Sequence, residues 1–363
     1  MKKLVYLLLI TVFMFLVMGC KKNDKDVNEQ NDINPTKKIT PTEKAESTPT
    51  PEAEIHEGKM KSYLSGNWVP EEVGNKRPYA LQLSNFKKVS NQWGISSADI
   101  IYEALVEGGI TRLLAIGESF TEDRLGSIRS SRHYFASIAE DYNAIYVHFG
   151  KTKYAVTKLK ELNSDNLDGG TGVGTIVFYR DNTMKAPHNA FASIDGIMAG
   201  IESKGYSIEY DQDFEPNLRF NDEDTDLPGE DLAKNIKIGF SNYTSPSFEY
   251  NEKDKLYYRY QFNGPHIDSN TGEQLKFKNL IIQYVKQRPI DRNDYQTIDF
   301  EDASGKGVYI SNGKQIPITW ERNEKTGYMR FFTEDGQNLL MNQGKTFITL
   351  FPNDRINDVV IEG

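Results

Sequence analysis

Cysteine is almost absent from this chain: among 363 residues the only one is Cys20. Beyond that position there is no thiol for a disulfide, a thiolate metal site or a cysteine nucleophile. Basic residues are also too few to make the protein cationic, since 43 lysines and arginines face 52 acidic residues and leave a formal net charge of −9. An acidic balance of this kind argues against a nucleic-acid partner.

Long hydrophobic runs are missing as well, apart from one near the N-terminus. Leu4 to Val17 is almost entirely apolar, follows two lysines, and leads into Met18-Gly19-Cys20. A short positive segment, an apolar stretch too short for a membrane span and a small residue before cysteine are typical of a lipoprotein signal peptide. We therefore predict a signal peptide with a lipobox over residues 1–20, lipidation of Cys20, and a diacyl anchor on the extracytoplasmic face of the membrane.

Aromatic residues are scarce over residues 21–62, where Lys, Asp, Glu, Thr and Pro predominate, as in PTKKITPTEKAESTPTPEAE. Such a segment cannot bury enough apolar surface to offset the entropy of ordering, so we predict a disordered tether. The composition becomes globular at about residue 63, and about 300 residues remain. We expect an N-terminal α/β domain over 63–205, an acidic linker over 206–235 and a C-terminal mostly β domain over 236–363.

Strands that alternate with helices in the N-terminal domain predict a mainly parallel sheet covered by helices. One helix is predicted over 95–109, where Ser96 and Asp99 have the spacing of a capping box before an apolar stripe. A second is predicted from Ser130 or Ser131 to Ala139. The other predicted helices span 154–162 and 190–204, and the predicted strands span 112–118, 143–149 and 175–180.

Short segments with alternating apolar residues predict a largely antiparallel C-terminal half. Asn312-Gly313 between two of these segments is a strong signal for a type I′ hairpin turn. The fold class expected from the sequence is therefore α/β in the N-terminal part and mostly antiparallel β in the C-terminal part, or α+β overall.

The segment GSIRSSRHYF, residues 126–135, is a dense cationic turn in an acidic protein. Arginine forks and free N–H groups at the start of a helix favour an anion, and ligands gather beyond the carboxyl ends of parallel strands. We therefore predict a pocket for a carboxylate or a phosphate. The predicted ligand-binding residues are Arg129, Ser130, Arg132, His148, Arg180, His188 and Asn189. In the alternative, Arg129 and Arg132 pair with Glu103, Glu107 or Glu118 and lock a strand to a helix.

Two sets of residues are candidates for catalysis. His188 follows Ala186-Pro187 in a loop and is a candidate general base or acid near neutral pH. Glu103 and Glu107 lie four residues apart, so on the predicted helix they would share one face and could act as acid and base in glycoside cleavage.

Familiar signatures of cofactor and metal chemistry are missing from the chain. The loop DGGTGVG (168–174) lacks the lysine of a P-loop, and neither GxSxG nor HExxH occurs. Asp222, Asp224 and Asp226 alternate like the start of a calcium loop, but the turn glycine and the closing glutamate of that loop are absent. The sequence therefore predicts neither a cofactor nor a metal.

Seven segments in order resemble the successive motifs of the YerB family of bacterial lipoproteins, which is described by a domain of unknown function. The resemblance implies an N-terminal α/β portion, a C-terminal mostly β portion and a lipoprotein of a Gram-positive or related bacterium. The family commonly has an aspartate where this chain has Ser84. The segments are RPYALQLSN, SSADIIYEALVEGGITRLLAI, GSIRSSRHYF, AIYVHFG, APHNAF, GPHIDSNTGEQLKFKNLIIQ and GKGVYISNGKQIPITW, and together they span about Arg77 to Thr349.

Three functional hypotheses follow. In the first, the Arg/Ser/His pocket binds an anionic ligand of the cell envelope, such as a wall-peptide carboxylate or a teichoic phosphate. In the second, the protein is a peptidoglycan-active hydrolase or transferase that uses His188, or Glu103 with Glu107. In the third, it is a protein-interaction module of the envelope. The expected partners are the membrane, through lipidated Cys20, and a cell-wall polymer or an envelope protein.

Overall fold

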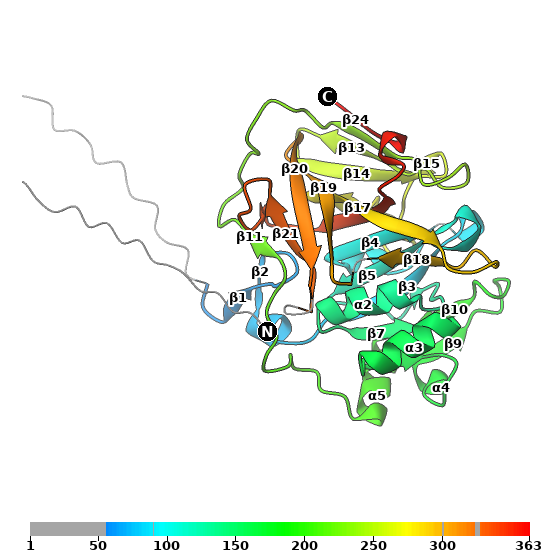
Figure 1. Ribbon diagram of the computed structural model, residues 1–363. Coiled ribbons are helices and arrows are strands. Elements are labelled where there is room, and N and C mark those ends of the chain that lie inside the picture. Colours follow the sequence, from blue (N-terminus) through cyan, green and yellow to red (C-terminus); the bar gives the residue numbers. More distant parts are fainter. Residues whose placement is uncertain (1–55, 90, 300, 324–326) are drawn as a thin grey trace, which may run out of the picture. The chain divides into compact units, whose positions relative to one another are not determined.

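A large mixed sheet forms the centre of the fold (Figure 1). The computed structural model describes residues 56–363 apart from 90, 300 and 324–326. Within these residues the sheet has the order β21-β20-β19-β17-β23-β4-β5-β3-β7-β8, and β18 pairs with β17. Its strands are β3 (Tyr79–Asn85), β4 (Ile100–Leu105), β5 (Thr111–Gly117), β7 (Ile145–His148), β8 (Asn166–Asp168), β17 (Asn279–Pro289), β18 (Gln296–Asp299), β19 (Ala303–Ser311), β20 (Lys314–Arg322), β21 (Arg330–Thr333) and β23 (Thr346–Pro352).

Both faces of this sheet are packed against hydrophobic core. Along β3, Leu81 and Leu83 belong to one cluster of buried side chains and Ala80 belongs to the other. Along β5, Leu113 and Leu114 divide between the same two clusters. A strand that is buried on both faces has a nearly continuous apolar sequence instead of a clean alternation.

The prediction of a helix over 95–109 is wrong for this reason. Ile95–Ser97 forms a short 3₁₀ turn, η2, and Ile100–Leu105 is strand β4, in which every residue is buried. Ser96 does not cap a helix, because its backbone N–H and its hydroxyl both donate to Asp268 Oδ2, each at 2.7 Å. Glu103 and Glu107 therefore do not share a helix face: Glu103 lies in β4 and Glu107 begins the 3₁₀ turn η3 (Glu107–Gly109).

The predicted mainly parallel sheet of the N-terminal part also needs correction. Strand β5 runs antiparallel to both of its neighbours, β3 and β4, whereas β3 with β7 and β7 with β8 are parallel. In the C-terminal half, β17 with β19 and β19 with β20 are antiparallel, but β23 runs parallel to both β17 and β4. Because β23 pairs with β4, strands of both halves form one sheet, and the described residues belong to a single compact unit.

A second sheet and three small ones complete the β structure of the described residues. The second sheet has the order β15-β14-β13-β12-β24, with β16 beside β14. Its strands β13, β14, β15 and β24 are labelled in Figure 1. Its strands are β12 (Asn235–Ile238), β13 (Ser247–Asn251), β14 (Leu256–Gln261), β15 (Gly264–Pro265), β16 (Lys276–Phe277) and β24 (Val359–Glu362). The small sheets pair β1 (Lys59–Lys61) with β2 (Trp68–Pro70), β10 (Ala190–Ala192) with both β6 (Leu125–Gly126) and β9 (Phe178–Arg180), and β11 (Arg219–Phe220) with β22 (Leu340–Met341).

Two of the three longer helices among the described residues begin at a capping side chain. Thr152 Oγ1 accepts a hydrogen bond from the N–H of Ala155 at 3.2 Å and caps α3, and Ser193 caps α5 in the same way through the N–H of Gly196. Helices α2 and α3 pack side by side, with α2 also against β7 (Figure 1). The helices are α1 (Glu71–Gly74), α2 (His133–Asp141), α3 (Lys153–Glu161), α4 (Gly174–Val177) and α5 (Ile194–Lys204), with 3₁₀ turns η1 (Lys87–Val89) and η4 (Ile356–Asp358) in addition to η2 and η3.

The other local predictions meet with mixed results. The helix predicted over 154–162 is confirmed as α3, and the strands predicted over 112–118 and 143–149 are confirmed as β5 and β7. The helix predicted over 190–204 begins later, after β10, and the strand predicted over 175–180 begins as helix α4. Helix α2 starts after Arg132, so neither Ser130 nor Ser131 caps it.

The hairpin predicted at Asn312-Gly313 is confirmed. Both residues have positive φ angles, 52° and 76°, and they join β19 to β20. A type I′ turn needs positive φ at both central positions, which asparagine and glycine adopt most readily.

The start of the chain lies largely outside the described residues. This holds for the predicted signal peptide, for the lipobox with Cys20, and for the tether up to residue 55. Strand β1 at Lys59–Lys61 pairs with β2, so the folded part begins before the predicted boundary at residue 63. Within the described residues, the helices are too short or too polar to cross a membrane.

Candidate anion-binding site

Backbone hydrogen bonds hold the cationic turn between the ends of two parallel strands, β3 and β7. The N–H of Arg129 donates to Gln82 O at 2.7 Å, and the N–H of Phe149 donates to Arg129 O at 3.0 Å. On either side of Arg129, the N–H of Ser84 donates to Ser127 O and the N–H of Ser131 donates to Gly150 O. The turn is therefore fixed at the edge of the sheet where β3 and β7 end.

A further arginine, which the sequence analysis did not select, joins this edge. Arg112 lies in β5 directly opposite Ser84 of β3, because the two strands are antiparallel. The same antiparallel pairing places Glu118, which follows β5, at the other end of the sheet. Arg112 is 4% exposed, and its guanidinium donates to Ser130 O. In the sequence, Arg112 is a charged residue at the start of an apolar strand. This pattern places Arg112 beside the cationic turn only when the antiparallel direction of β5 is known.

One of the arginines is fully engaged by a carboxylate. Arg132 Nε lies 3.1 Å from Glu107 Oε2, and its Nη2 donates to Glu107 Oε1, so the pair is bidentate. Arg112 Nη2 is 3.9 Å from the same carboxylate. The alternative in which arginines of the turn lock neighbouring elements together therefore holds for Arg132 with Glu107.

The positive charges of Arg112 and Arg129 are not neutralised by a bidentate carboxylate as that of Arg132 is. Burial lowers the pKa of Arg112 to about 9, with a further contribution from the positive charge of Arg132. Burial also lowers the pKa of Arg129, and the charges of Arg132 and Arg180 add to this effect. These groups stay protonated at neutral pH, so their lowered pKa values reflect the cost of holding positive charges together away from water.

His188 lies beside Arg129 in the loop that joins β9 to β10, so its predicted place in a loop is confirmed, although the loop leads into a strand. Its Nδ1 is 3.3 Å from Ser84 Oγ, and its ring stacks on Phe86 with centroids 4.8 Å apart. Arg129 Nη1 donates to Pro187 O at 2.6 Å and so holds the loop. Burial, together with the charges of Arg129 and Arg112, lowers the pKa of His188 from its usual value, which favours the neutral imidazole.

Arg180 and Asn189 flank this group from the same hairpin. Arg180 Nη1 donates to Asn189 Oδ1 at 2.8 Å, and its guanidinium lies 4.6 Å from the centroid of the Phe149 ring. Asn189 Nδ2 donates to Asp181 O at 3.2 Å, which leaves this buried amide in a structural role within the hairpin. The structure thus brings together Arg112, Arg129, Ser130, Arg180 and His188, which we call the arginine cluster.

Comparison with known proteins identifies a family whose two domains include the motifs around this cluster. Residues 64–207 match the N-terminal domain, and residues 236–348 the C-terminal domain, of a family described as "Protein of unknown function (DUF3048)". YerB of Bacillus subtilis (strain 168), described as a predicted lipoprotein, is 32% identical over 297 residues, which cover 81% of this chain and 87% of YerB. The chain belongs to the DUF3048 family. The crystal structure of YerB from Bacillus subtilis matches with a TM-score of 0.74 at 29% identity and covers 84% of this chain and 100% of that one.

The resemblance of this DUF3048 protein to the YerB family is thus confirmed, but the family description assigns no activity. His148 is fully buried, with Nδ1 2.9 Å from Gly150 O and Nε2 3.2 Å from Asn166 Oδ1. Because both ring nitrogens face protein groups, this geometry favours a structural role for His148.

The two glutamates proposed as an acid–base pair have separate partners in this DUF3048 protein. Glu103 is fully buried and pairs with Arg259 Nη2 at 2.8 Å, and it also accepts hydrogen bonds from Asn85 Nδ2 at 2.9 Å and Thr111 Oγ1 at 2.6 Å. Glu107 pairs with Arg132 instead, and that charge contributes to lowering its pKa. Each carboxylate is thus committed to an ion pair of its own, a geometry that favours structural roles for both.

Proposed function

We propose that this protein is a lipid-anchored protein of the extracytoplasmic membrane face that binds an anionic ligand of the cell envelope through the arginine cluster. The lipobox at Cys20 supports the anchor, as does a relative described as a predicted lipoprotein. The excess of positive charge in the cluster supports an anionic ligand. Its arginines are held close together, and the nearby carboxylate of Glu107 is already paired with Arg132. An anion bound there would relieve this repulsion.

Arg129 is the residue that carries the proposal. Among the described residues, its side chain makes one hydrogen bond, to Pro187 O, so further N–H groups of the guanidinium remain for a ligand. A guanidinium is planar and binds a carboxylate or a phosphate with two parallel hydrogen bonds. The hydroxyl of Ser130 would donate one more, and the neutral imidazole of His188 would orient the anion. A carboxylate of a wall peptide and a phosphate of a teichoic polymer both fit this chemistry.

An apolar shelf beside the cluster suits a polymer better than a free ion. The Phe86 ring stacks on His188 and also, with centroids 5.8 Å apart, on Tyr243 of the C-terminal half. Tyr243 is 37% exposed. A ligand that carries its charge on a larger body can therefore contact Arg129 and this shelf together.

Replacing Arg129 by glutamine is expected to weaken retention of the protein on cell-wall material by about tenfold or more, since a hydrogen bond to a charged group contributes about 1.5–3 kcal/mol. The measurement is sedimentation of the purified protein with peptidoglycan that carries wall teichoic acid, repeated with peptidoglycan from which the teichoic acid has been removed. Loss of retention on the stripped material identifies the phosphate polymer as the ligand, and full retention identifies the peptidoglycan.

Arg219→Gln is the matched control for this experiment. Arg219 also donates to the backbone carbonyl of a proline, Pro216, but it lies in β11, outside the cluster. Its substitution removes the same charge and the same kind of contact, so retention should stay within about twofold of the wild type. Equal retention of the Arg129 and Arg219 variants, both well folded, contradicts the proposal.

One contact favours a second candidate function, a peptidoglycan-active hydrolase or transferase. Ser84 Oγ and the neutral His188 are within hydrogen-bond reach, as a nucleophile and its general base must be. The same incubations distinguish the two functions when the supernatant is read by mass spectrometry. Wall fragments that appear with the wild type and disappear with His188→Ala establish an enzyme, whereas retention without fragments supports the binding protein.

A further inference from the structure

A cavity of about 650 Å³ lies away from the arginine cluster, where segments of both halves of the chain meet. Its apolar wall is made by buried residues from before and within β4 and from the strand region around β16. This volume is in the range of sites that bind small molecules, and such sites usually combine an apolar wall with a few polar groups. The buried apolar residues of the wall are Ile95, Ala98, Ile101, Leu275 and Phe277, and the half-buried Leu256 of β14 adds to them.

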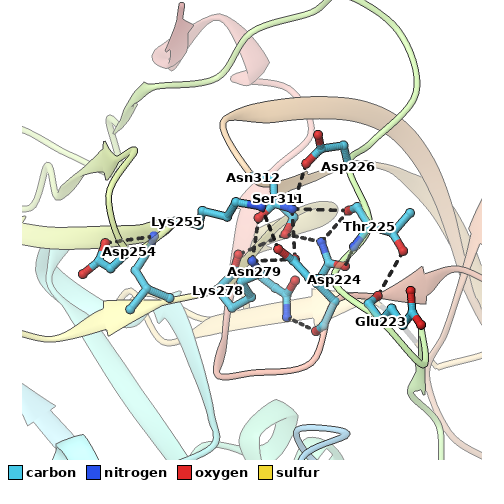
Figure 2. Close-up of polar contacts among 12 residues, drawn as sticks. Glu223, Asp224, Thr225, Asp226, Asp254, Lys255, Lys278, Asn279, Ser311 and Asn312 are labelled. Atoms are coloured by element: carbon cyan, nitrogen blue, oxygen red, sulfur yellow. Dashed lines mark hydrogen bonds and ion pairs between the residues drawn. The ribbon is translucent and has the colours of Figure 1, made fainter. Parts of the chain in front are cut away.

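Two lysines at this cavity converge on a single carboxylate (Figure 2). Lys278 Nζ is 2.7 Å from Asp224 Oδ1, and Lys255 Nζ is 2.9 Å from Asp224 Oδ2. Asn312 Nδ2 donates to Asp224 Oδ1 at 3.0 Å. The side chain of Lys278 is only 11% exposed, so this ammonium group is shielded from water and requires an anionic partner. Burial alone would raise the pKa of Asp224, but these contacts hold it at about 2.

Asp224 belongs to a segment that lies on the surface and is held by side chains from several neighbouring elements. All residues from Asp222 to Asp226 are exposed. Thr225 exchanges two hydrogen bonds with Asn342, each at 2.8 Å, and Asp226 accepts from Asn312 Nδ2 at 3.0 Å. We call residues 222–226 the acidic strap. The alternating aspartates that resembled a calcium loop thus serve as partners of lysine and asparagine side chains.

We propose that this cavity is a second binding site, which takes a small amphipathic anion, and that Asp224 is a built-in competitor for its two lysines. The carboxylate or phosphate of such a ligand would replace Asp224 between Lys255 and Lys278, and its apolar body would contact the wall of the cavity. Because Asp224 is part of the same chain, its effective concentration at the lysines is high, so free ligand must overcome it. Ligand binding would release the acidic strap. This site is independent of the arginine cluster.

The test uses 8-anilinonaphthalene-1-sulfonate, an anion on an apolar ring system whose fluorescence rises when it leaves water. Asp224→Asn removes the competing charge and keeps the size of the side chain, so its affinity for the probe should rise by roughly 5- to 100-fold, as expected for removal of an intramolecular coupling. Asp226→Asn is the matched control, two residues away, and should change affinity by less than about twofold. The double variant Asp224→Asn with Lys278→Gln should return to weak binding.

Two outcomes of the binding measurement overturn the proposal. One is equal probe affinity of the Asp224 variant and the wild type at matched thermal stability, and the other is a double variant that keeps the gain.

A second readout uses the wild-type chain and needs no substitution. Saturating probe should speed cleavage after Glu223 by a glutamate-specific protease several-fold, as the strap is released. An unchanged cleavage rate at saturation also contradicts the proposal.

Discussion

Glu103→Gln is expected to lower the free energy of unfolding by about 3–5 kcal/mol, the loss typical of breaking a buried ion pair by removing one partner. Glu103 and Arg259 are both fully buried. The polar partners of the Glu103 carboxylate, Arg259, Asn85 and Thr111, are all donors. A glutamine would turn its own amide N–H groups toward one of these donors and leave the positive charge of Arg259 without a counter-charge. Chemical denaturation of both proteins at pH 7 measures the difference.

An exposed ion pair provides the control for this experiment. Asp299 Oδ1 lies 3.3 Å from Arg288 Nη2, and Asp299 Oδ2 lies 3.7 Å from Lys286 Nζ. All three side chains are at least one-third exposed. Asp299→Asn should therefore change the free energy of unfolding by less than about 1 kcal/mol. If Glu103→Gln changes the free energy of unfolding as little as Asp299→Asn does but abolishes a wall-cleaving activity, then Glu103 is catalytic and its structural role is wrong.

Glu118→Gln is expected to stabilise the protein at pH 8 and to have a much smaller effect at pH 5. Burial raises the pKa of Glu118 from 4.5 to about 7; the nearby Ser62 side chain opposes this rise and the nearby charge of Asp99 adds to it. The folded state therefore holds this proton more tightly than the unfolded chain does. The resulting stability is fully present below pH 4.5 and is lost as the pH rises through 7.

Glutamine resembles the protonated acid at every pH, so the gain should grow between pH 5 and pH 8 and reach roughly 3 kcal/mol, from about 1.4 kcal/mol for each pKa unit. Unfolding curves at pH 5, 6, 7 and 8 measure it. Glu252 has a pKa lowered by a contact with Lys234 and is fully exposed, so Glu252→Gln should show no such gain. A gain that is independent of pH would contradict the assigned pKa of Glu118.

The sequence predicted elements well where one local signal determined the conformation. The helix predicted over 154–162 is α3, and Asn312-Gly313 defines the turn between β19 and β20. It failed for β4, because a strand buried on both faces has no alternation and its apolar residues also fit a helical stripe. The pairing of β23 with β4 joins residues about 250 positions apart, and no local pattern specifies it.

The candidate site was predicted in the same partial way. Arg129 and His188 were selected from their residue types, and the structure does bring them together through Pro187. Arg112 was missed because its place at this edge depends on the antiparallel direction of β5. Arg132 was selected for a ligand, yet it pairs with Glu107, since a turn with several arginines gives no indication of which of them meets a carboxylate.

The measurement that tests the central claim most directly is an NMR titration of the His188 imidazole with glycerol 3-phosphate, a fragment of a teichoic polymer. The chain has only five histidines, so the His188→Ala variant assigns the signal. In the free protein, burial and the charges of Arg129 and Arg112 lower the pKa of His188. A bound phosphate offsets those charges, so the pKa should rise on saturation, and Arg129→Gln should weaken the effect about tenfold or more. A His188 signal that stays unmoved, with or without shifts elsewhere in the protein, would contradict an anion-binding arginine cluster.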